Sequence, residues 1–240
     1  MLKGYFQGLY QDTALQSTKY LFSLLEKNKK AFLLDCGCWD GTNTLKYAQS
    51  IGTRHVYGIE IDENLDIAKK KGIEVKKRDL NKVFPFKDEF FDVVVAYHVI
   101  EHLVNVRLFV SECNRVLKKN GYLLIGTPNL ASWHNIFPLL AGMQPFSGPT
   151  IKPDYKSDFG FVNDMNKDRM DTVFSKESET LDHVKVMTTR ALISLLEENK
   201  FRIEKFEGFG YYPFPPMASR YMSYADPYHS HYIVVKSRKQ

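Results

Sequence analysis

The stretch from Ala31 to Gly41, with the sequence AFLLDCGCWDG, constrains the fold more than any other part of the chain. A short apolar run ends at Asp35, and a turn with glycines at positions 37 and 41 follows. In open α/β sheets, a buried strand that leads into a glycine-bearing loop and then a helix presents backbone N–H groups to a ligand. The stretch therefore predicts the first β-turn-α unit of such a sheet.

The same unit recurs along the first half of the chain. Residues 91–96 are apolar enough to form a strand that is buried on both faces. Asp12 is expected to cap a helix that covers the sheet, and residues 118–121 are expected to end a later helix. The predicted strands are 31–34, 55–60, 73–77, 91–96 and 122–126, and the predicted helices between them are 42–50, 63–71 and 106–117. This alternation predicts a parallel, doubly wound sheet with ligands at the carboxyl ends of its strands.

The pattern changes after Thr127. Residues 128–180 contain many Pro, Gly, Asn and Asp residues and scattered aromatic residues, which indicates a lid or substrate-binding insertion with a short helix near 130–141. Regularity then returns with a helix over 190–199, capped by Thr189, and a strand over 201–209. Residues 211–227 are predicted as a loop, and 231–236 as a last, antiparallel strand.

Composition excludes several classes of protein. The 240 residues are 44% hydrophobic, which suits one domain with insertions. A net charge of +5, from 33 Lys and Arg against 28 Asp and Glu, is too small to require a nucleic-acid or membrane partner. No apolar run of about eighteen residues and no signal-peptide core are present, so we expect a cytoplasmic protein without a membrane span. The three cysteines make no disulfide framework and fit a reducing compartment.

Motifs at five successive predicted strands together resemble class I S-adenosylmethionine-dependent methyltransferases, of the type found in ubiquinone and menaquinone biosynthesis. They are Leu33–Gly41, Gly58–Asp62, Asp79-Leu80, His98–Leu103, and Arg115–Leu117 with Gly121–Leu123. The resemblance covers residues 20–130 and 188–236. It implies a seven-stranded, mostly parallel Rossmann-like sheet with helices on both faces, S-adenosyl-L-methionine as cofactor, and a lid insertion after the fifth strand.

The implied organisation is a single methyltransferase domain over 1–240. Residues 12–128 would form the cofactor-binding core, 129–187 the substrate or lid insertion, and 188–240 the helix and strands that complete the sheet.

The glycine turn itself argues against a dinucleotide. A G-x-G-x-x-G loop lets the backbone approach a pyrophosphate, whereas here only Gly37 and Gly41 remain, with Trp39 and Asp40 between them. S-adenosylmethionine has no phosphate, and its ammonium and sulfonium groups are compatible with a nearby Asp35 carboxylate. The turn therefore favours the methionine end of that cofactor.

Acids at the next two strand ends complete a nucleoside site. Glu60 can accept hydrogen bonds from both ribose hydroxyls, and Asp79 can accept from the adenine amino group, between apolar walls of Ile61 and Leu80. The expected cofactor-binding residues are Asp35, Gly37, Cys38, Trp39, Asp40, Gly41, Glu60, Ile61, Asp79, Leu80, Tyr97 and His98.

Each assignment has a structural alternative. Asp35 could cap the following turn, Glu60 could be a surface acid, and Asp79 could form a solvated ion pair with Arg78. Trp39 could belong to the core. The cysteines at 36 and 38 form a C-x-C string without a second pair, so small residues in a tight turn explain them better than a metal site does.

The string from His98 to His102 carries the most chemistry. His98, Glu101 and His102 would share a helical face, which is a pattern that can bind metal. Some members of the broader family bind a divalent metal through an acid and a histidine at this position, and others carry the string without a metal. We expect no metal here. His98, His102 and His134 are the candidate general bases for an acceptor that is a weak acid.

The acceptor is predicted mainly from missing motifs. Neither an N-P-P-Y string nor a Pro-Cys nucleophile is present, and the basic residues at 69–71 and 76–78 are typical of a solvated face. The aromatic insertion and the loop 211–216 favour a small organic acceptor. We expect methylation at oxygen and a chain that is a monomer or homodimer. An RNA or protein methyltransferase, a non-catalytic nucleotide-binding protein and an NAD-dependent oxidoreductase remain as alternatives.

Overall fold

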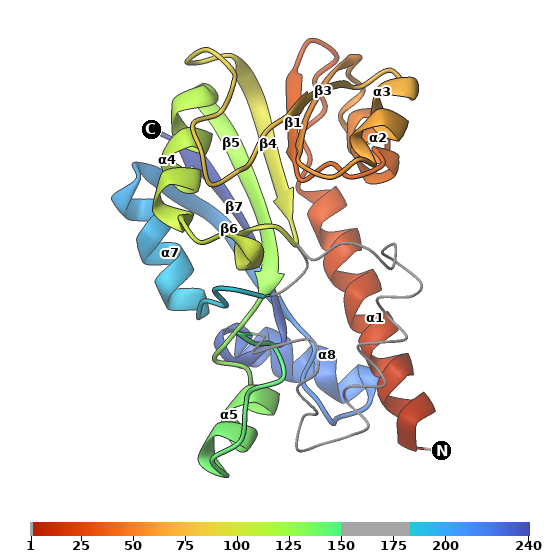
Figure 1. Cartoon of the computed structure of the whole chain (residues 1–240). Helices are drawn as coiled ribbons and strands as arrows, with labels where there is room; N and C mark the ends of the chain where they lie inside the picture. Colours follow the sequence, from red (N-terminus) through yellow and green to blue (C-terminus); the bar gives the residue numbers. More distant parts are fainter. Residues whose placement is uncertain (1, 150–182) are drawn as a thin grey trace.

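A seven-stranded mixed sheet forms the centre of the molecule, with the strand order β3-β2-β1-β4-β5-β7-β6 (Figure 1). The computed structural model describes residues 2–149 and 183–240. The strands are β1 (Phe32–Cys36), β2 (His55–Glu60), β3 (Glu74–Lys77), β4 (Phe91–Tyr97), β5 (Leu117–Pro128), β6 (Phe201–Phe209) and β7 (Tyr232–Lys239). Strands β1 to β5 pair in parallel, and β7 runs antiparallel between β5 and β6. The predicted fold class is therefore confirmed.

The order of the strands reverses at β1. The chain moves outward from β1 through β2 to β3, and then returns to place β4 on the other side of β1. Asp35 of β1 lies beside Gly58 of β2 and Val95 of β4. In parallel sheets, ligands bind in the crevice at such a reversal, outside the carboxyl ends of the strands. The glycine turn after β1 opens at this position.

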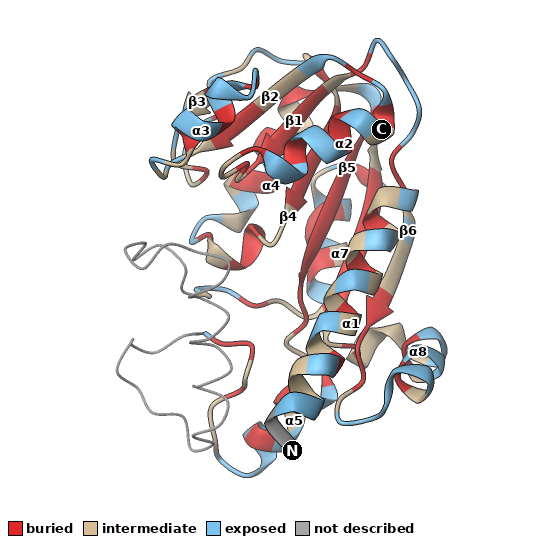
Figure 2. Ribbon diagram, turned by 90° about the vertical axis from the view of Figure 1, so that its right-hand side faces the viewer, coloured by how far each residue is buried: buried red, intermediate tan, exposed pale blue. Residues whose placement is uncertain are grey.

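Helices cover both faces of the sheet. They are α1 (Leu2–Ser23), α2 (Thr42–Ile51), α3 (Leu65–Lys70), α4 (Val106–Val116), α5 (Trp133–Leu140), α7 (Thr189–Glu198) and α8 (Pro216–Ala225), with short 3₁₀ turns η1 (Ile100–His102) and η2 (Pro227–His229). Apolar side chains of α4 and α7 pack on one face, and those of α1 and α2 pack on the other. Figure 2 shows the buried strands between helices whose outer surfaces are exposed.

Strand β4 is buried on both faces, as predicted. Val94 and Ala96 join the core on the α4 side, and Val93 and Val95 join the core on the α1 side. Successive side chains of a strand point to opposite faces, so only an unbroken apolar run can fill both cores.

Three boundary predictions are wrong at helix and strand ends. Helix α1 begins at Leu2, so Asp12 lies inside it and bonds to Arg220 at 3.0 Å instead of capping. Thr188, rather than Thr189, caps α7 by accepting from the N–H of Ala191 at 3.2 Å. Strand β5 already begins at Leu117 and includes residues 118–121, which were expected to end the preceding helix.

The predicted loop at 211–227 contains a helix, α8, which begins at Pro216. Proline is favoured in the first turn of a helix because its fixed φ is already helical and its missing N–H would have no partner there. The short helix expected near 130–141 is present as α5. Most of the predicted insertion, residues 150–182, lies outside the described residues.

Across residues 2–149 and 183–240, every helix is too short or too polar to cross a bilayer.

The fold predicts a large difference between two phenylalanines. Phe109 of α4 is fully buried in the core, whereas Phe137 of α5 is 60% exposed. We expect Phe109→Ala to lower the free energy of unfolding by about 3–5 kcal/mol, because it removes a core side chain and leaves a cavity. Phe137→Ala, the matched control, should cost less than about 1 kcal/mol in urea unfolding. Equal losses would contradict this packing.

Candidate active site

The turn after β1 is fixed to the end of β2 by backbone hydrogen bonds. The N–H groups of Gly37 and Cys38 both donate to the carbonyl oxygen of Ile59, at 2.8 and 3.3 Å. Gly37 and Gly41 have φ angles of 73° and 77°, a region that disfavours residues with a side chain. Trp39 also has a positive φ, 44°. The turn therefore has a defined shape that depends on its glycines.

Asp35 lies beneath this turn and is 5% exposed. Its Oδ2 accepts a hydrogen bond from Thr44 Oγ1 at 2.5 Å. Burial raises the pKa of Asp35 to about 7, against the opposing effect of the Thr44 hydrogen bond and with a further rise from the charge of Glu60. A cationic group in the crevice would stabilise the ionised form, so the surroundings of Asp35 fit the ammonium of S-adenosylmethionine.

Glu60 is oriented at the end of β2 by three backbone N–H groups. Its Oε2 accepts from Trp39 at 2.8 Å, and its Oε1 accepts from Ile61 at 2.7 Å and Asp62 at 3.1 Å. A carboxylate oxygen can accept more than one hydrogen bond, so these contacts leave capacity for a ribose hydroxyl. The carboxylate is held by the turn itself, which a surface acid would not be.

Asp79 and Asn81 join two loops of the site. Asp79 Oδ1 accepts from the backbone and side-chain nitrogens of Asn81, at 2.8 and 2.9 Å. Asn81 Oδ1 in turn accepts from the N–H groups of Val104 and Asn105, both at 2.9 Å. Arg78 Nε donates to the carbonyl oxygen of Val83 at 3.0 Å. The loops after β3 and β4 are thus tied together beside the expected adenine position.

The predicted apolar walls differ in exposure. Leu80 is 9% exposed and packs into the core, whereas Ile61 is 46% exposed. An exposed apolar side chain next to Glu60 is available to cover a flat ring, whereas Leu80 already has protein neighbours.

Two other predicted cofactor residues have structural partners. Asp40 forms an ion pair with Lys71 at 2.9 Å and accepts from the N–H of Thr42, also at 2.9 Å, so it holds the start of α2. Cys38 is buried, and its thiol fits against Gly58, where any Cβ would overlap it. Burial raises the pKa of the Cys36 and Cys38 thiols, which disfavours the thiolate that a metal needs.

Tyr97 is the last residue of strand β4, and His98 follows it. The Tyr97 hydroxyl bonds to Ser17 at 2.8 Å and to Thr18 at 3.2 Å, so it anchors α1 to the sheet. His98 has a φ of 56°, and its Nδ1 lies 3.2 Å from Glu101 Oε1. The hydrogen bond to Glu101 fixes one ring nitrogen of His98, which orients the ring as the partner of a general base does.

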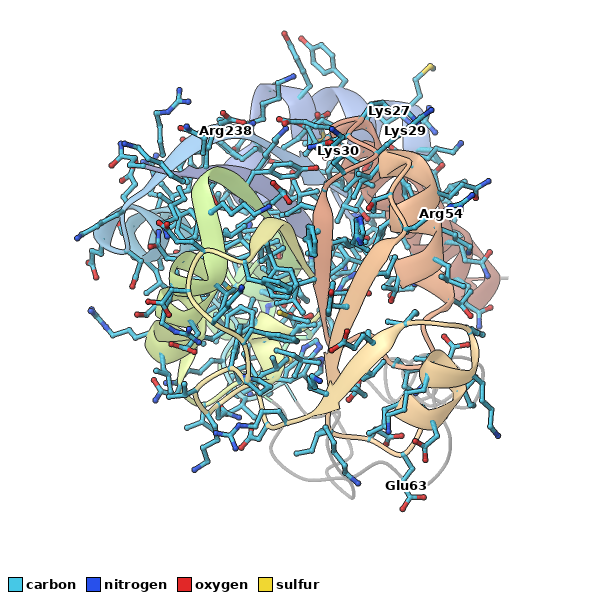
Figure 3. All side chains as sticks on the ribbon, turned by 90° about the horizontal axis from the view of Figure 1, so that it is seen from above. Lys27, Lys29, Lys30, Arg54, Glu63 and Arg238 are labelled. Carbon is cyan, nitrogen blue, oxygen red and sulfur yellow. The ribbon has the colours of Figure 1, made fainter. Side chains whose placement is uncertain are left out.

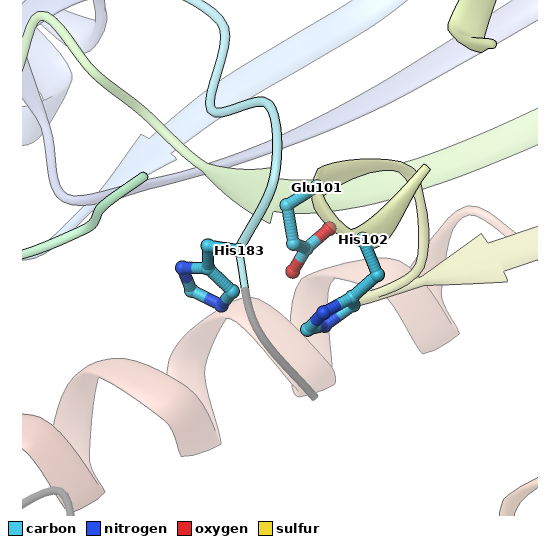
Figure 4. Close-up of side chains that lie close together, drawn as sticks. All are labelled: Glu101, His102 and His183. Atoms are coloured by element: carbon cyan, nitrogen blue, oxygen red, sulfur yellow. The ribbon is translucent and has the colours of Figure 1, made fainter. Parts of the chain in front are cut away.

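Glu101 is fully buried beside several histidines. Its Oε2 accepts from Thr127 Oγ1 at 2.9 Å. Burial alone would raise the pKa of Glu101, but the hydrogen bond from His98 and the charges of His98, His102 and His183 together hold its pKa at about 2. Figure 4 shows Glu101, His102 and His183 pointing toward one another. Glu101 therefore remains a carboxylate inside the protein.

The third predicted base, His134, belongs to a second group of side chains. Its Nε2 lies 2.8 Å from Nδ1 of His231 and 3.4 Å from Ser147 Oγ. Burial lowers the pKa of His134 to about 3, so this imidazole is neutral. The two groups are connected, because the Ser147 carbonyl oxygen lies 2.6 Å from Nδ1 of His183.

The site contains residues that sequence reasoning did not select. Thr44 bonds to Asp35, Thr127 bonds to Glu101, and His183 and His231 lie beside the predicted bases. Thr44 lies in the first turn of the helix after the glycines, where a hydroxyl near an acid is a weak signal. His183 and His231 lie outside the helices and strands, and local sequence gives no indication of their partners.

One group of basic side chains lies away from this site. In Figure 3, Lys27, Lys29, Lys30 and Arg54 lie near one another, and Glu63 lies on the opposite side of the view. Residues 27–30 precede β1 and Arg54 precedes β2, whereas Glu63 follows β2. These cations therefore mark the amino ends of the strands, opposite to the site.

Comparison with known proteins gives one family match and several relatives. Residues 34–125 match the family model described as a methyltransferase domain. A protein of Mycolicibacterium smegmatis named as a probable S-adenosylmethionine-dependent methyltransferase is 36% identical over 100 residues, which are 40% of this chain and 38% of that protein. The mitochondrial ubiquinone biosynthesis O-methyltransferase of Bos taurus is 35% identical over 107 residues, which are 40% of this chain and 28% of that protein.

A solved structure of an S-adenosylmethionine-dependent methyltransferase from Mesorhizobium loti matches with a TM-score of 0.60 and 16% identity, over 92% of this chain and 96% of that chain. This likeness shows the fold. The matched stretch covers less than two fifths of the two sequence relatives above. Together the matches confirm the resemblance to S-adenosylmethionine-dependent methyltransferases over residues 34–125.

The glycine turn predicts a difference between two substitutions at positive φ. A Cβ at Gly41 would overlap Ile73 and approach the Cα of Ala68 to 3.2 Å, whereas a Cβ at Gly72 would meet nothing within 4 Å. We expect Gly72→Ala to cost about 1 kcal/mol of stability from backbone strain alone. Gly41→Ala should cost about 2–4 kcal/mol, because overlap adds to that strain. Urea unfolding measures both, and equal costs would contradict the close packing of Gly41 against α3.

The raised pKa of Asp35 predicts a pH dependence of stability. In the unfolded chain this carboxyl has a pKa of about 3.9, and in the folded, ligand-free protein its pKa is about 7. The folded state then binds the proton more tightly, so the free energy of unfolding falls as pH rises between these values, by a few kcal/mol.

Asp35→Asn should remove this contribution. Asn can still accept from Thr44, so the variant should be more stable than the ligand-free wild type at pH 8, and the difference should shrink toward pH 5. Urea unfolding across this range provides the test. A constant difference between the two proteins would show that Asp35 is ionised throughout.

Proposed function

We propose that this chain is an S-adenosylmethionine-dependent methyltransferase that transfers the methyl group to an oxygen of a small organic acceptor. One observation carries the proposal: the carboxyl groups of Asp35, Glu60 and Asp79 lie at the ends of three neighbouring parallel strands. Asp35 precedes the glycine turn, and Glu60 accepts a hydrogen bond from its Trp39 N–H. This arrangement presents acceptors to a ligand that is cationic at one end and carries a nucleoside at the other.

The described residues fit this cofactor better than a dinucleotide. Asp35 lacks a cationic partner in the contacts that the described residues provide, and its pKa is raised accordingly. Glu60 and Asp79 are held by N–H groups in fixed orientations. A pyrophosphate would add negative charge next to Asp35 and Asp40, and no third glycine follows in the turn.

The chemistry requires little from the protein once the cofactor is bound. The sulfonium supplies an activated methyl group, so the protein must place the acceptor atom in line with it and exclude water. A hydroxyl acceptor also needs its proton removed. His98 is the base that we propose, because its Nδ1 is held by Glu101 and its ring lies against Tyr97 and Tyr232.

We propose a small-molecule acceptor because aromatic side chains surround the candidate bases. His134 stacks with Phe146 and contacts Tyr212, and His231 contacts Tyr212 and Tyr232. The basic residues at 27–30 and 54 precede β1 and β2 and so lie at the edge of the sheet away from the site, whereas Lys77 lies beside Glu60 at the carboxyl ends of the strands. One sequence relative is named as an O-methyltransferase of ubiquinone biosynthesis, which supports oxygen as the acceptor atom.

Calorimetric titration tests the cofactor. We expect the chain to bind S-adenosylmethionine and its demethylated product and to show no binding of NAD. Glu60→Gln and Asp35→Asn should each weaken binding about 10- to 100-fold, because each removes a hydrogen bond or charge interaction with an ionised partner. Glu63→Gln, an exposed acid of the same loop, is the matched control. Unchanged affinity in both site variants, or tight NAD binding, would overturn the proposed site.

The base is tested separately by turnover. With a phenolic acceptor identified from a metabolite screen, His98→Gln should lower kcat, measured at saturating S-adenosylmethionine, about 10²- to 10⁴-fold. Raising the pH should recover part of the lost rate, because hydroxide can then ionise the acceptor. A variant with normal kcat would exclude His98 as the base.

A further inference from the structure

Three side chains with metal-ligating atoms converge beside the proposed base. One ligand atom from each of Glu101, His102 and His183 lies within 4.8 Å of the others (Figure 4). Glu101 and His102 belong to η1, whereas His183 comes from the segment that leads into α7. The rings of His102 and His183 have their centroids 5.0 Å apart. The fold has thus brought His183 next to residues that precede it by 81 and 82 positions in the chain.

Backbone contacts hold the two segments together. The carbonyl oxygen of Glu101 accepts from the N–H groups of Val184, at 2.8 Å, and Lys185, at 3.0 Å. The ammonium of Lys185 donates to the carbonyl oxygen of Val104 at 2.6 Å. These bonds fix the residue next to His183 against η1 by its main chain. The main-chain position of His183 is therefore set by contacts other than those of its own side chain.

Further hydrogen bonds orient the ligand atoms. The Ser147 carbonyl oxygen lies 2.6 Å from His183 Nδ1 and can only accept, so Nδ1 carries the proton and Nε2 holds the lone pair of the neutral ring. The Glu101 carboxylate is held by Thr127 Oγ1 at 2.9 Å and by His98 Nδ1 at 3.2 Å. In metal sites, outer contacts of this kind to carbonyl and hydroxyl groups fix the tautomer and orientation of the ligands.

We propose that Glu101, His102 and His183 bind a divalent transition-metal ion. One carboxylate and two imidazoles favour Zn²⁺, Mn²⁺ or Fe²⁺ over Mg²⁺ and Ca²⁺, which prefer all-oxygen sites. Ligands bonded at about 2.1 Å lie about 3.0–3.5 Å apart around a tetrahedral ion, so side-chain rotations that move the donor atoms by about an ångström complete the site. Three protein ligands leave positions for water or for another oxygen ligand.

This proposal differs from the expectation of no metal, which considered only residues 98–102. The structure shows that His98 bonds to Glu101 from outside the cluster, and that His183 supplies the third ligand instead. Binding of the metal itself does not depend on methyl transfer. Only one consequence rests on the proposed function: an acceptor hydroxyl bound at an open position would have a lowered pKa, next to His98.

The competing explanation is a cluster of protonated histidines around the Glu101 carboxylate. In that case His102 and His183 would provide the positive charge that keeps Glu101 ionised, and no metal would bind with affinity above that of surface groups. Replacing either histidine would then change the free energy of unfolding and its pH dependence, and the wild type itself would show no specific metal binding. The two explanations therefore differ in a direct binding measurement.

The test uses the full chain, freed of metal with a chelator and titrated calorimetrically with ZnCl₂ or MnCl₂. We expect one ion per chain, with binding weakened at least 100-fold by His183→Gln and by His102→Gln. His55→Gln, at an exposed position at the start of β2, is the matched control and should bind as the wild type does. Co²⁺ spectra should show nitrogen and oxygen ligands without the charge-transfer band of a thiolate, which excludes Cys36, Cys38 and Cys113 as the site.

Two measurements keep the outcomes distinct. Thermal unfolding should show a metal-dependent rise in Tm for the wild type and for His55→Gln, and none for the two site variants. S-adenosylmethionine titration of the same samples shows whether each variant is folded and whether the proposed function survives. Absence of metal binding to a wild type that binds S-adenosylmethionine would overturn the metal site alone. Equal metal affinity in wild type and both variants would overturn it as well.

Discussion

Burial of β1 and β4 on both faces is the constraint on which the rest of the structure depends. Leu33, Leu34, Val93, Val94 and Val95 are fully buried, so neither strand has a side that can carry chemistry along its length. Polar groups can be placed only where these strands end. The parallel pairing of β1 with β2 and β4 then brings their ends to the same edge of the sheet. The position of the site follows from the burial of the strands that lead to it.

Two buried carboxyl groups at this edge show how surroundings assign different roles to the same chemistry. Among the described residues, the Thr44 hydroxyl is the side-chain partner of Asp35, and burial raises the pKa of Asp35 to about 7. Glu101 is at least as buried, yet its hydrogen bond to His98 and three neighbouring imidazoles bring its pKa to about 2. Because desolvation acts on both, the difference comes from nearby positive charge. Asp35 needs a cationic ligand to become ionised at neutral pH, whereas Glu101 is already an anion and can bind a cation without losing a proton.

The sequence predicted those features that depend on local pattern. Local patterns predicted the strands that are present: the apolar run at 91–96, the glycines at 37 and 41, and the acids at 35, 60 and 79. The errors occur where distant residues decide. Asp12 was expected to cap a helix, but Arg220 pairs with it and α1 continues through it. Likewise α8 lies in a segment whose prolines and tyrosines indicated only a loop.

The same reasoning explains why the candidate site could be predicted only in part. The string at 98–102 carries His98, Glu101 and His102 within one turn, so their proximity is readable from spacing. His183 reaches them because main-chain donors of the next two residues bond to the carbonyl oxygen of Glu101. Backbone hydrogen bonds of this kind make no demand on the identity of the side chains involved. No pattern in the sequence could therefore have indicated this pairing.

Val99 packs between the glycine turn at 37–41 and the cluster formed by Glu101, His102 and His183. A Cβ at Gly37 would lie 2.7 Å from Cγ2 of Val99, so the turn and η1 are in close contact. The carbonyl oxygen of Val99 accepts from the N–H of His102 at 3.0 Å, which sets the first turn of η1. Closely packed groups transmit displacement because they have no free volume to absorb it. The side chain of Val99 therefore limits how closely the glycine turn and η1 can approach one another.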